Sequence, residues 1–407
     1  MGFNVFDTQN TMVGTLASSV SSLFTEVKMK NPPVSSSGSR FAFLDNLRIY
    51  LTILVILHHT ALAFGGSGSW TVDDPNADLL SEVVFTFFNA VNQTYFMSLF
   101  FLMAGYFTPR SLEKKGPRSY LLDRLIRLGI PILVYTTLII NLNEYIVRVR
   151  YMGLPMAWRL EYDPGHLWFL QALLLFAVIY VIYRLIIYKD TSASLWHVYL
   201  DRFPPDRVLV VCIAVLSVLT FLVRLAAPIG EWFFGLQLAH FSHYIFCFFV
   251  GILAYRGEWF SKLQRPQAKH WGIVALVTIP FFFVLLIAGG VLEGEEQLAK
   301  FMGGPTWQSF ALSIWETILL FAISIFLLYF FRERINMRTP LLAVMATSVY
   351  TVYIIHQTIV TWVDTWFIPL DLHMFVKFAG VSLISIPLCF ALAYLILKIP
   401  GVKRVVG

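Results

Sequence analysis

Long apolar runs recur along the chain from residue 43 to residue 398. A helix needs about 20 predominantly apolar residues to cross the hydrocarbon core of a bilayer. Because lipid offers the backbone no hydrogen-bond partners, such runs fold as membrane-spanning helices. Only 13% of the 407 residues are charged, which is about half the share found in a soluble domain. We therefore predict an all-α, polytopic membrane protein.

Ten runs qualify as spans, and they define the expected domain plan. Residues 1–40 are polar and Ser-rich, so we expect a disordered or interfacial N-terminal tail there. Residues 41–400 should form one ten-helix membrane domain, and residues 401–407 a short cytoplasmic tail. The predicted spans cover residues 43–64, 83–105, 126–146, 167–188, 207–226, 240–256, 271–291, 310–331, 342–363 and 374–398.

The distribution of Lys and Arg predicts an orientation. With the N-terminus in the cytoplasm, 24 of the 30 Lys and Arg fall on the cytoplasmic side, as the positive-inside rule requires. We therefore expect both termini in the cytoplasm and the protein in the cell membrane. The net charge of +6 then reflects cytoplasmic loops, and no nucleic acid is expected. The basic residues assigned to the outside are Arg148, Arg150, Arg159, Arg224, Lys300 and Lys377.

The first predicted helix carries ionisable residues, which are costly inside a membrane. Its sequence, LDNLRIYLTILVILHHT (residues 44–60), places Arg48 and His59 eleven positions apart. At about 100° per residue these two share a helix face, about 16 Å apart along the axis, whereas His58 points about 80° away from Arg48. A ligand with an anionic head and a long thin arm would fit this geometry. Its head would pair with arginines, and its reactive end would reach His59.

Four segments together resemble the acyltransferase 3 family of membrane O-acyltransferases. The first is the R-x10-H pattern of Arg48 and His59, and the second contains Arg124-x-x-Arg127. The GHLWFL segment and the AGYF part of the second segment look like the glucan-modifying, succinyltransferase-like branch. The likeness covers roughly residues 41–400, and its further segments are FFLMAGYFTPRSLEKKGPRSYLLDRLIRLGIP (100–131), GHLWFL (165–170) and SVYTVYIIHQ (348–357).

The resemblance implies transfer of an acyl group, acetyl or succinyl, from cytoplasmic acyl-CoA to a hydroxyl of a carbohydrate or other acceptor on or near the outer side. His59 would be the general base that takes the hydroxyl proton. Arg48, Arg124 and Arg127 would bind the phosphates of coenzyme A. We expect acyl-CoA as a co-substrate, no permanently bound cofactor and no metal.

Many members of this family carry a fused extracytoplasmic hydrolase-like domain that completes the transfer. The sequence shows no such domain, so we expect the chain either to acylate the final acceptor itself or to pass the group to a partner. The other expected partners are acyl-CoA, a glycan or small hydroxylated acceptor, and the lipid bilayer. A homodimer is left open.

Several candidate residues also have structural interpretations. His59 could be a packed polar residue bonded to a helix carbonyl, and Arg48 an anchor paired with Asp45. The acceptor-side candidates could instead form an interfacial belt or interhelical hydrogen bonds. These candidates are His166, Trp168, Glu144, Tyr353 and His356.

The alternative function is a multi-pass transporter of a small anionic or acylated solute, because ten helices with buried charges also describe carriers. A carrier more often shows paired halves and Gly/Pro-broken helices at matching positions. Neither feature is found in the sequence, so the enzyme is the favoured interpretation.

Overall fold

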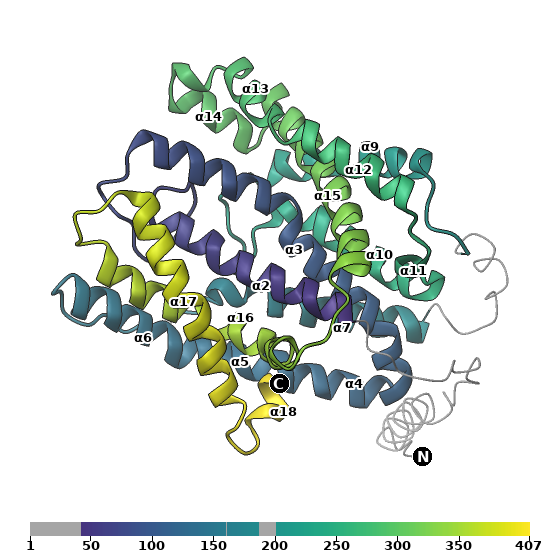
Figure 1. Cartoon of the computed structure of the whole chain (residues 1–407), viewed down its shortest axis with the longest axis horizontal. Coiled ribbons are helices and arrows are strands. Elements are labelled where there is room, and N and C mark those ends of the chain that lie inside the picture. The colour runs from purple at the N-terminus through teal and green to yellow at the C-terminus, as the bar shows by residue number, and fades with distance from the viewer. Residues whose placement is uncertain (1–41, 160, 187–200) are drawn as a thin grey trace, which may run out of the picture.

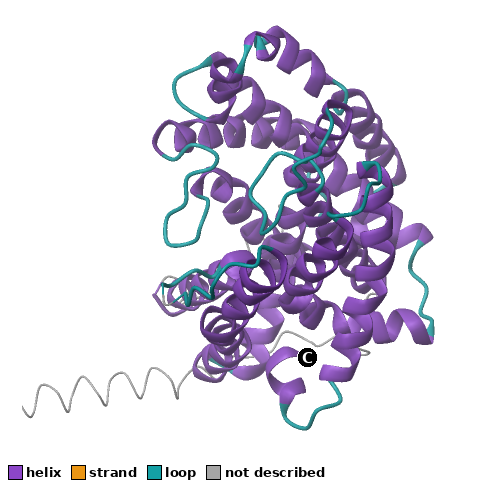
Figure 2. Ribbon diagram, turned by 90° about the vertical axis from the view of Figure 1, so that its left-hand side faces the viewer, coloured by secondary structure: helices purple, strands orange, loops and turns teal. Residues whose placement is uncertain are grey.

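The structure, a computed structural model, describes residues 42–159, 161–186 and 201–407. Within these ranges it consists of helices, shown in Figure 2, and one isolated β-bridge between Phe233 and Leu236, without a strand. Nine helices of the described residues are long and apolar enough to cross a membrane. The prediction of an all-α polytopic membrane protein is confirmed. The predicted tail at residues 1–40 lies outside the described ranges.

These nine helices coincide with nine of the ten predicted spans. They are α2 (Ala42–Ala63), the composite helix Pro117–Tyr151, η4 with α7 (Gly165–Leu167, Trp168–Ile186), α9 (Asp206–Ala226), η5 with α10 (Leu238–His240, Phe241–Gly257), α12 with α13 (Arg265–Thr278, Phe281–Ala288), α15 (Trp307–Arg334), α16 (Pro340–Phe367) and α17 (Met374–Ile396). The shorter helices are α11 (Trp259–Lys262), η6 (Val291–Glu293), α14 (Glu295–Met302) and α18 (Val402–Val406).

The remaining predicted span, 83–105, lies within α3 (Leu79–Lys115), a helix of 37 residues. This helix is not among the nine because its polar residues lower its mean hydropathy. At about 1.5 Å per residue it is still long enough to cross a bilayer. Two of the polar residues, Asn89 and Asn92, are each only 4% exposed. The polar face of α3 is therefore turned into the bundle, as expected for polar residues inside a membrane.

The composite helix Pro117–Tyr151 alternates between α and π turns. Its segments are α4 (Pro117–Arg124), η1 (Leu125–Gly129), α5 (Ile130–Val134), η2 (Tyr135–Ile139), α6 (Ile140–Glu144) and η3 (Tyr145–Tyr151). Pro131 contributes no N–H to the helix. π turns are rare in proteins as a whole, but where they occur they are often at functional sites. Arg124 ends α4 and Arg127 lies in η1. Both residues therefore stand on a helix, which begins before the predicted span at 126–146.

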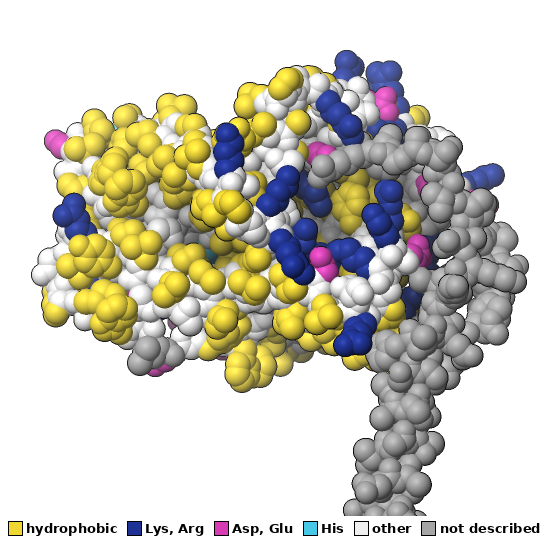
Figure 3. Space-filling view, turned by 90° about the horizontal axis from the view of Figure 1, so that it is seen from below, with side chains coloured by type: hydrophobic (Ala, Val, Ile, Leu, Met, Phe, Trp, Pro, Cys, Tyr) yellow, Lys and Arg dark blue, Asp and Glu magenta, His cyan; other side chains and the backbone are white. Residues whose placement is uncertain are grey.

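The two ends of the bundle differ in charge. In Figure 1 the loops 64–78 and 368–373 lie at the left-hand end, and α4 and α11 at the right-hand end. Figure 3 shows that Lys and Arg side chains gather over the right-hand half of the lower face, where they border a hollow, while hydrophobic side chains cover the left-hand half. The C-terminal residue Gly407 lies beside η1, because Arg127 Nη1 donates to its carbonyl oxygen (2.7 Å).

Helices α3 and α10 are in backbone contact. A Cβ atom at Gly105 would lie 2.0 Å from the carbonyl oxygen of Phe248, and one at Gly251 would lie 2.1 Å from that of Leu102. Small residues at a helix crossing allow two backbones to approach this closely. Any larger side chain at either position would force α3 and α10 apart.

Candidate active site

A cavity of about 2150 Å³ lies between the helices. It is lined by α2, α3, the composite helix, η4, α10, α15 and α16, and also by residues of the loop 64–78 and of α14. Pockets for a single small ligand usually measure about 300–1,000 Å³. The cavity therefore has room for an extended ligand or for more than one substrate.

The structure separates the nine predicted site residues into two groups. Five of them line the cavity: His59, Glu144, His166, Trp168 and Tyr353. His356 joins this group through its ring, which lies 5.2 Å from the ring of His59 and 4.7 Å from that of His166. The remaining three, Arg48, Arg124 and Arg127, are not part of the cavity lining.

His59 is flanked by two roughly parallel rings. Its ring centroid lies 4.4 Å from that of Trp70, with 17° between the planes, and 5.2 Å from that of His356, with 27° between the planes. Within the described residues, its Nδ1 is buried and has no hydrogen-bond partner. The alternative in which a helix carbonyl holds this imidazole therefore finds no support at Nδ1. Stacking fixes a ring that a hydrogen bond usually fixes.

His166 and His356 are held by the backbone of α16. His356 Nδ1 lies 2.7 Å from the carbonyl oxygen of Tyr353, so this nitrogen donates. His166 Nε2 lies 3.0 Å from the same carbonyl oxygen, and its Nδ1 lies 2.5 Å from Gln357 Oε1. The hydroxyls of Tyr135 and Tyr353 donate to Gln357 and to the carbonyl of His166, respectively. These bonds join the beginning of the fourth span to α16 beside His59.

Two other acceptor-side candidates present different chemistry to the cavity. The ring of Trp168 stacks on that of Tyr244, with centroids 5.3 Å apart and 26° between the planes. Glu144 Oε1 pairs with Arg159 Nε at 2.6 Å. All four side chains line the cavity. Its wall therefore offers both aromatic surface and a paired carboxylate.

The predicted CoA ligands make contacts of their own. Arg48 pairs with Asp45 (3.5 Å), as the sequence suggested, and its guanidinium lies 5.0 Å from the ring centroid of Phe107. The guanidinium of Arg124 lies 5.0 Å from the ring centroid of Tyr120. These contacts keep both side chains against aromatic rings.

Trp70 and Asp364 are residues that the sequence analysis missed. Trp70 stacks on His59, and its Nε1 donates to Asp364 Oδ2 (3.0 Å). Asp364 is 0% exposed, near the end of α16. A carboxylate beside an apolar run was the only available signal, because ionisable residues at membrane depth are costly and usually functional.

The loop 64–78 that carries Trp70 is tied down at two further points. Asp74 Oδ2 lies 2.6 Å from Lys377 Nζ in a buried ion pair, and the hydroxyls of Thr71 and Thr361 are 2.7 Å apart. Partial burial also raises the pKa of Asp73 in the same loop. Lys377 was assigned to the outside by counting charges, yet its side chain is buried. The loop is thus anchored to α16 and α17.

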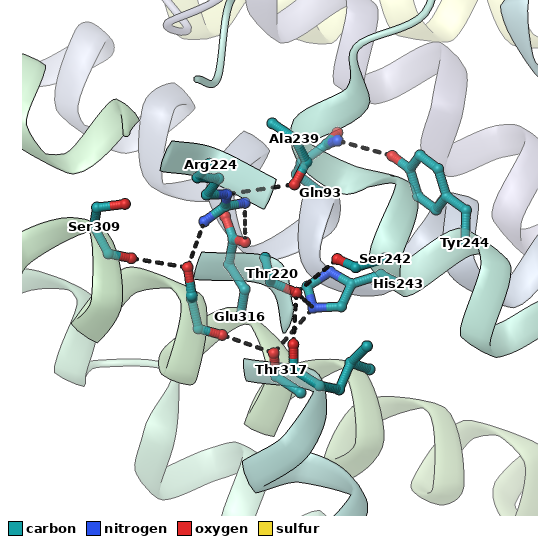
Figure 4. A network of polar contacts seen from close by, with 12 residues as sticks. Gln93, Thr220, Arg224, Ala239, Ser242, His243, Tyr244, Ser309, Glu316 and Thr317 are labelled. Atoms are coloured by element: carbon teal, nitrogen blue, oxygen red, sulfur yellow. Dashed lines mark hydrogen bonds and ion pairs between the residues drawn. The ribbon is translucent and has the colours of Figure 1, made fainter. Parts of the chain in front are cut away.

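A second cluster of buried polar side chains borders the cavity at Glu316 (Figure 4). Arg224, which charge counting had placed outside, is 0% exposed and pairs with Glu316 at 2.5 Å. It also donates to Ser313 Oγ (3.2 Å) and to the carbonyl oxygen of Ala239 (3.4 Å). Glu316 was missed because its partner on α9 lies 92 residues away.

The same cluster includes His243. Its Nε2 lies 2.9 Å from Thr317 Oγ1 and 3.3 Å from Thr220 Oγ1. In the part of the chain that the structure describes, no group of three or more His, Cys, Asp or Glu side chains is arranged to hold a metal ion.

Comparison with known proteins gives one family. Residues 41–394 match the family described as an acyltransferase domain. Glucans biosynthesis protein C of Escherichia coli O6:K15:H31 is 29% identical over 155 residues, which cover 35% of this chain and 39% of that protein. The proteins of the same name from Escherichia coli K12 and Shigella dysenteriae serotype 1 are each 28% identical over the same shares. The matched segment therefore spans well under half the length of these relatives. No solved structure matches the chain.

Proposed function

The chain belongs to the acyltransferase domain family, and from this premise we propose that it is a membrane O-acyltransferase. It moves an acyl group, such as acetyl or succinyl, from acyl-CoA to a hydroxyl of a carbohydrate. The observation that carries this proposal is the position of His59 on the wall of a cavity large enough for an acceptor.

His59 serves as the general base in this proposal. The acceptor hydroxyl gives its proton to the imidazole while its oxygen attacks the thioester carbonyl. The C–S bond then breaks, and the leaving thiolate of coenzyme A takes up the proton. A neutral imidazole is suited to this role near pH 7.

The basic end of the bundle supports a donor site. Arg48 lies on α2 eleven residues before His59, about 16 Å along the axis. The Lys and Arg side chains around the hollow in Figure 3 suit the phosphates of coenzyme A. The thioester arm would then run from Arg48 to His59. This direction makes the basic end cytoplasmic, with both termini on that side.

The aromatic and acidic cavity wall supports a sugar acceptor. Trp168 and Tyr244 offer flat apolar faces of the kind that pack on a sugar ring, and Glu144 can accept hydrogen bonds from hydroxyls. The names of the curated relatives refer to glucans. A glucan is therefore the first acceptor to test.

The test is release of coenzyme A from acetyl-CoA or succinyl-CoA by the purified protein in detergent, with and without a glucan. The wild type should release CoA faster when the glucan is present and should acylate it. His59→Ala should lower the rate by about 100-fold or more, the usual contribution of a general base. His270→Ala, at an exposed histidine, is the matched control and should be fully active. Full activity of His59→Ala would remove His59 from the mechanism.

A second substitution tests the donor site. Arg48→Gln should raise the KM for acyl-CoA by about tenfold, the size expected when one charge-assisted phosphate contact is lost. Arg334→Gln replaces an exposed arginine at the end of α15 and should leave this KM unchanged. An unchanged KM in Arg48→Gln would place the coenzyme elsewhere.

A further inference from the structure

His59 has an unusual support for a general base. The second ring nitrogen of a catalytic histidine usually donates to a carboxylate or carbonyl, and this bond sets the tautomer and the ring plane. Here Nδ1 of His59 is buried without a partner among the described residues. No described group therefore holds the ring through this nitrogen.

Trp70 is placed to hold the ring of His59. Its indole lies 4.4 Å from the imidazole of His59 and is tilted by only 17°. His356 flanks the same imidazole at 5.2 Å. An imidazole between two such rings cannot turn out of its plane without losing both contacts.

Trp70 is in turn fixed by a bond at its edge. Its Nε1 donates to Asp364 Oδ2 at 3.0 Å, and the carboxylate is fully buried. The residue after Trp70 is tied to the same helix through the Thr71–Thr361 hydroxyl contact. The loop is therefore held to α16 at two positions, and these contacts keep the indole in a defined plane beside His59.

We propose that Trp70 is a positioning residue for His59 and that Asp364 holds Trp70 in place. This inference rests on the proposed function of His59 as a general base. It assigns to an indole the task that a hydrogen-bonded carboxylate performs in many other enzymes. Misplacing a catalytic group by about 1 Å can cost about 100-fold in rate, so a modest change in the ring plane should be measurable.

The first experiment replaces the indole. Trp70→Leu should lower kcat for CoA release with acetyl-CoA by about tenfold or more, while the KM for acetyl-CoA stays within about twofold. Trp70→Phe keeps an aromatic face and should recover most of that loss. Trp366→Leu, at a half-exposed tryptophan of α16 outside the cavity lining, is the control and should match wild type.

The second experiment tests the link to Asp364. Asp364→Asn retains an oxygen acceptor for the indole N–H and should be close to wild type, whereas Asp364→Leu should lower kcat. Because Asp364 acts through Trp70, adding Asp364→Leu to Trp70→Leu should cause no further loss. Independent, multiplying losses would overturn the link between the two residues.

A third measurement does not depend on activity. Diethyl pyrocarbonate modifies neutral imidazoles, and mass spectrometry reads the extent at His59. Loss of the indole in Trp70→Leu, or its displacement in Asp364→Leu, should make His59 react several-fold faster. Asp364→Asn should leave the rate of this reaction unchanged. If the wild type releases no CoA, the proposed function fails, and this readout still decides the positioning role. Unchanged reactivity of His59 in Trp70→Leu would overturn it.

Discussion

Two clusters of buried polar side chains border one cavity, and they differ in their hydrogen bonding. In the Arg224 cluster the guanidinium reaches Glu316, Ser313 and a backbone carbonyl, and His243 Nε2 lies between two threonine hydroxyls. In the His59 cluster, by contrast, His59 Nδ1 and His356 Nε2 are buried without partners among the described residues.

Under the proposed function, this difference separates a structural cluster from the catalytic one. More than about 90% of buried polar groups in proteins are hydrogen-bonded, and the exceptions call for a physical explanation such as a catalytic role. The Arg224 cluster, in which the guanidinium and the imidazole of His243 are hydrogen-bonded, holds α9, α10 and α15 together. The His59 cluster leaves one nitrogen of His59 and one of His356 without a partner among the described residues, at a cost in stability that the rest of the bundle must offset.

The largest expected effect on stability is at Glu316, in the Arg224 cluster. Glu316→Leu leaves Arg224 buried and unpaired, which should destabilise the protein by about 3–5 kcal/mol. Glu316→Gln keeps an oxygen acceptor and should lose less. The measurement is thermal unfolding in detergent with a thiol-reactive dye, because Cys247 and Cys389 are buried until the helices separate. Equal midpoints for Glu316→Leu and wild type would remove the structural role of the cluster.

Loss of the Asp74–Lys377 ion pair at the loop 64–78 should have an intermediate effect on stability. Lys377→Met leaves Asp74 buried, and the loss should lie toward the lower end of about 3–5 kcal/mol because the loop can admit water. This variant should also lower kcat, since the loop carries Trp70. A stability loss with unchanged kcat would show that the indole keeps its place without the ion pair. Thermal unfolding and CoA release together make the comparison.

The smallest expected effect on stability compares a hydrogen-bonded buried hydroxyl with one that has no partner among the described residues. Thr317→Val removes one of two partners of His243 and should destabilise by about 0.5–1.5 kcal/mol. Thr52→Val makes the same change on α2, where the hydroxyl is buried without a partner among the described residues, and should be neutral or stabilising. Paired unfolding midpoints test this. Equal losses in both variants would contradict the distinction between satisfied and unsatisfied groups.

The helices were predictable because their cause is local. Each apolar run must satisfy its own backbone in lipid, so α9 was predicted at 207–226 and found at Asp206–Ala226. The rings of the candidates His59, His166 and His356 meet in the structure, a contact that the sequence analysis did not predict. The i,i+3 pair of Arg48 and Asp45 depends on helix geometry alone and was also found.

The missed features depend on contacts between distant parts of the chain. Trp70 and Asp364 are 294 positions apart, and nothing in the loop sequence GGSGSW reveals where the indole will lie. Counting charges assigned Arg224 and Lys377 to the outer side but could not predict their burial, because the positive-inside rule has no means of recognising a buried partner such as Glu316 or Asp74. The π turns of the composite helix were also not predicted, since they leave the apolar pattern intact.

The glycine crossing of α3 and α10 limits how the cavity can change shape. With the two backbones touching at Gly105 and Gly251, these helices form one stiff partition that has no slack to give. A bulky acceptor therefore gains no room by parting these two helices. The separation of α3 and α10 stays the same from one turnover to the next, and any change in the width of the cavity must come from its other walls.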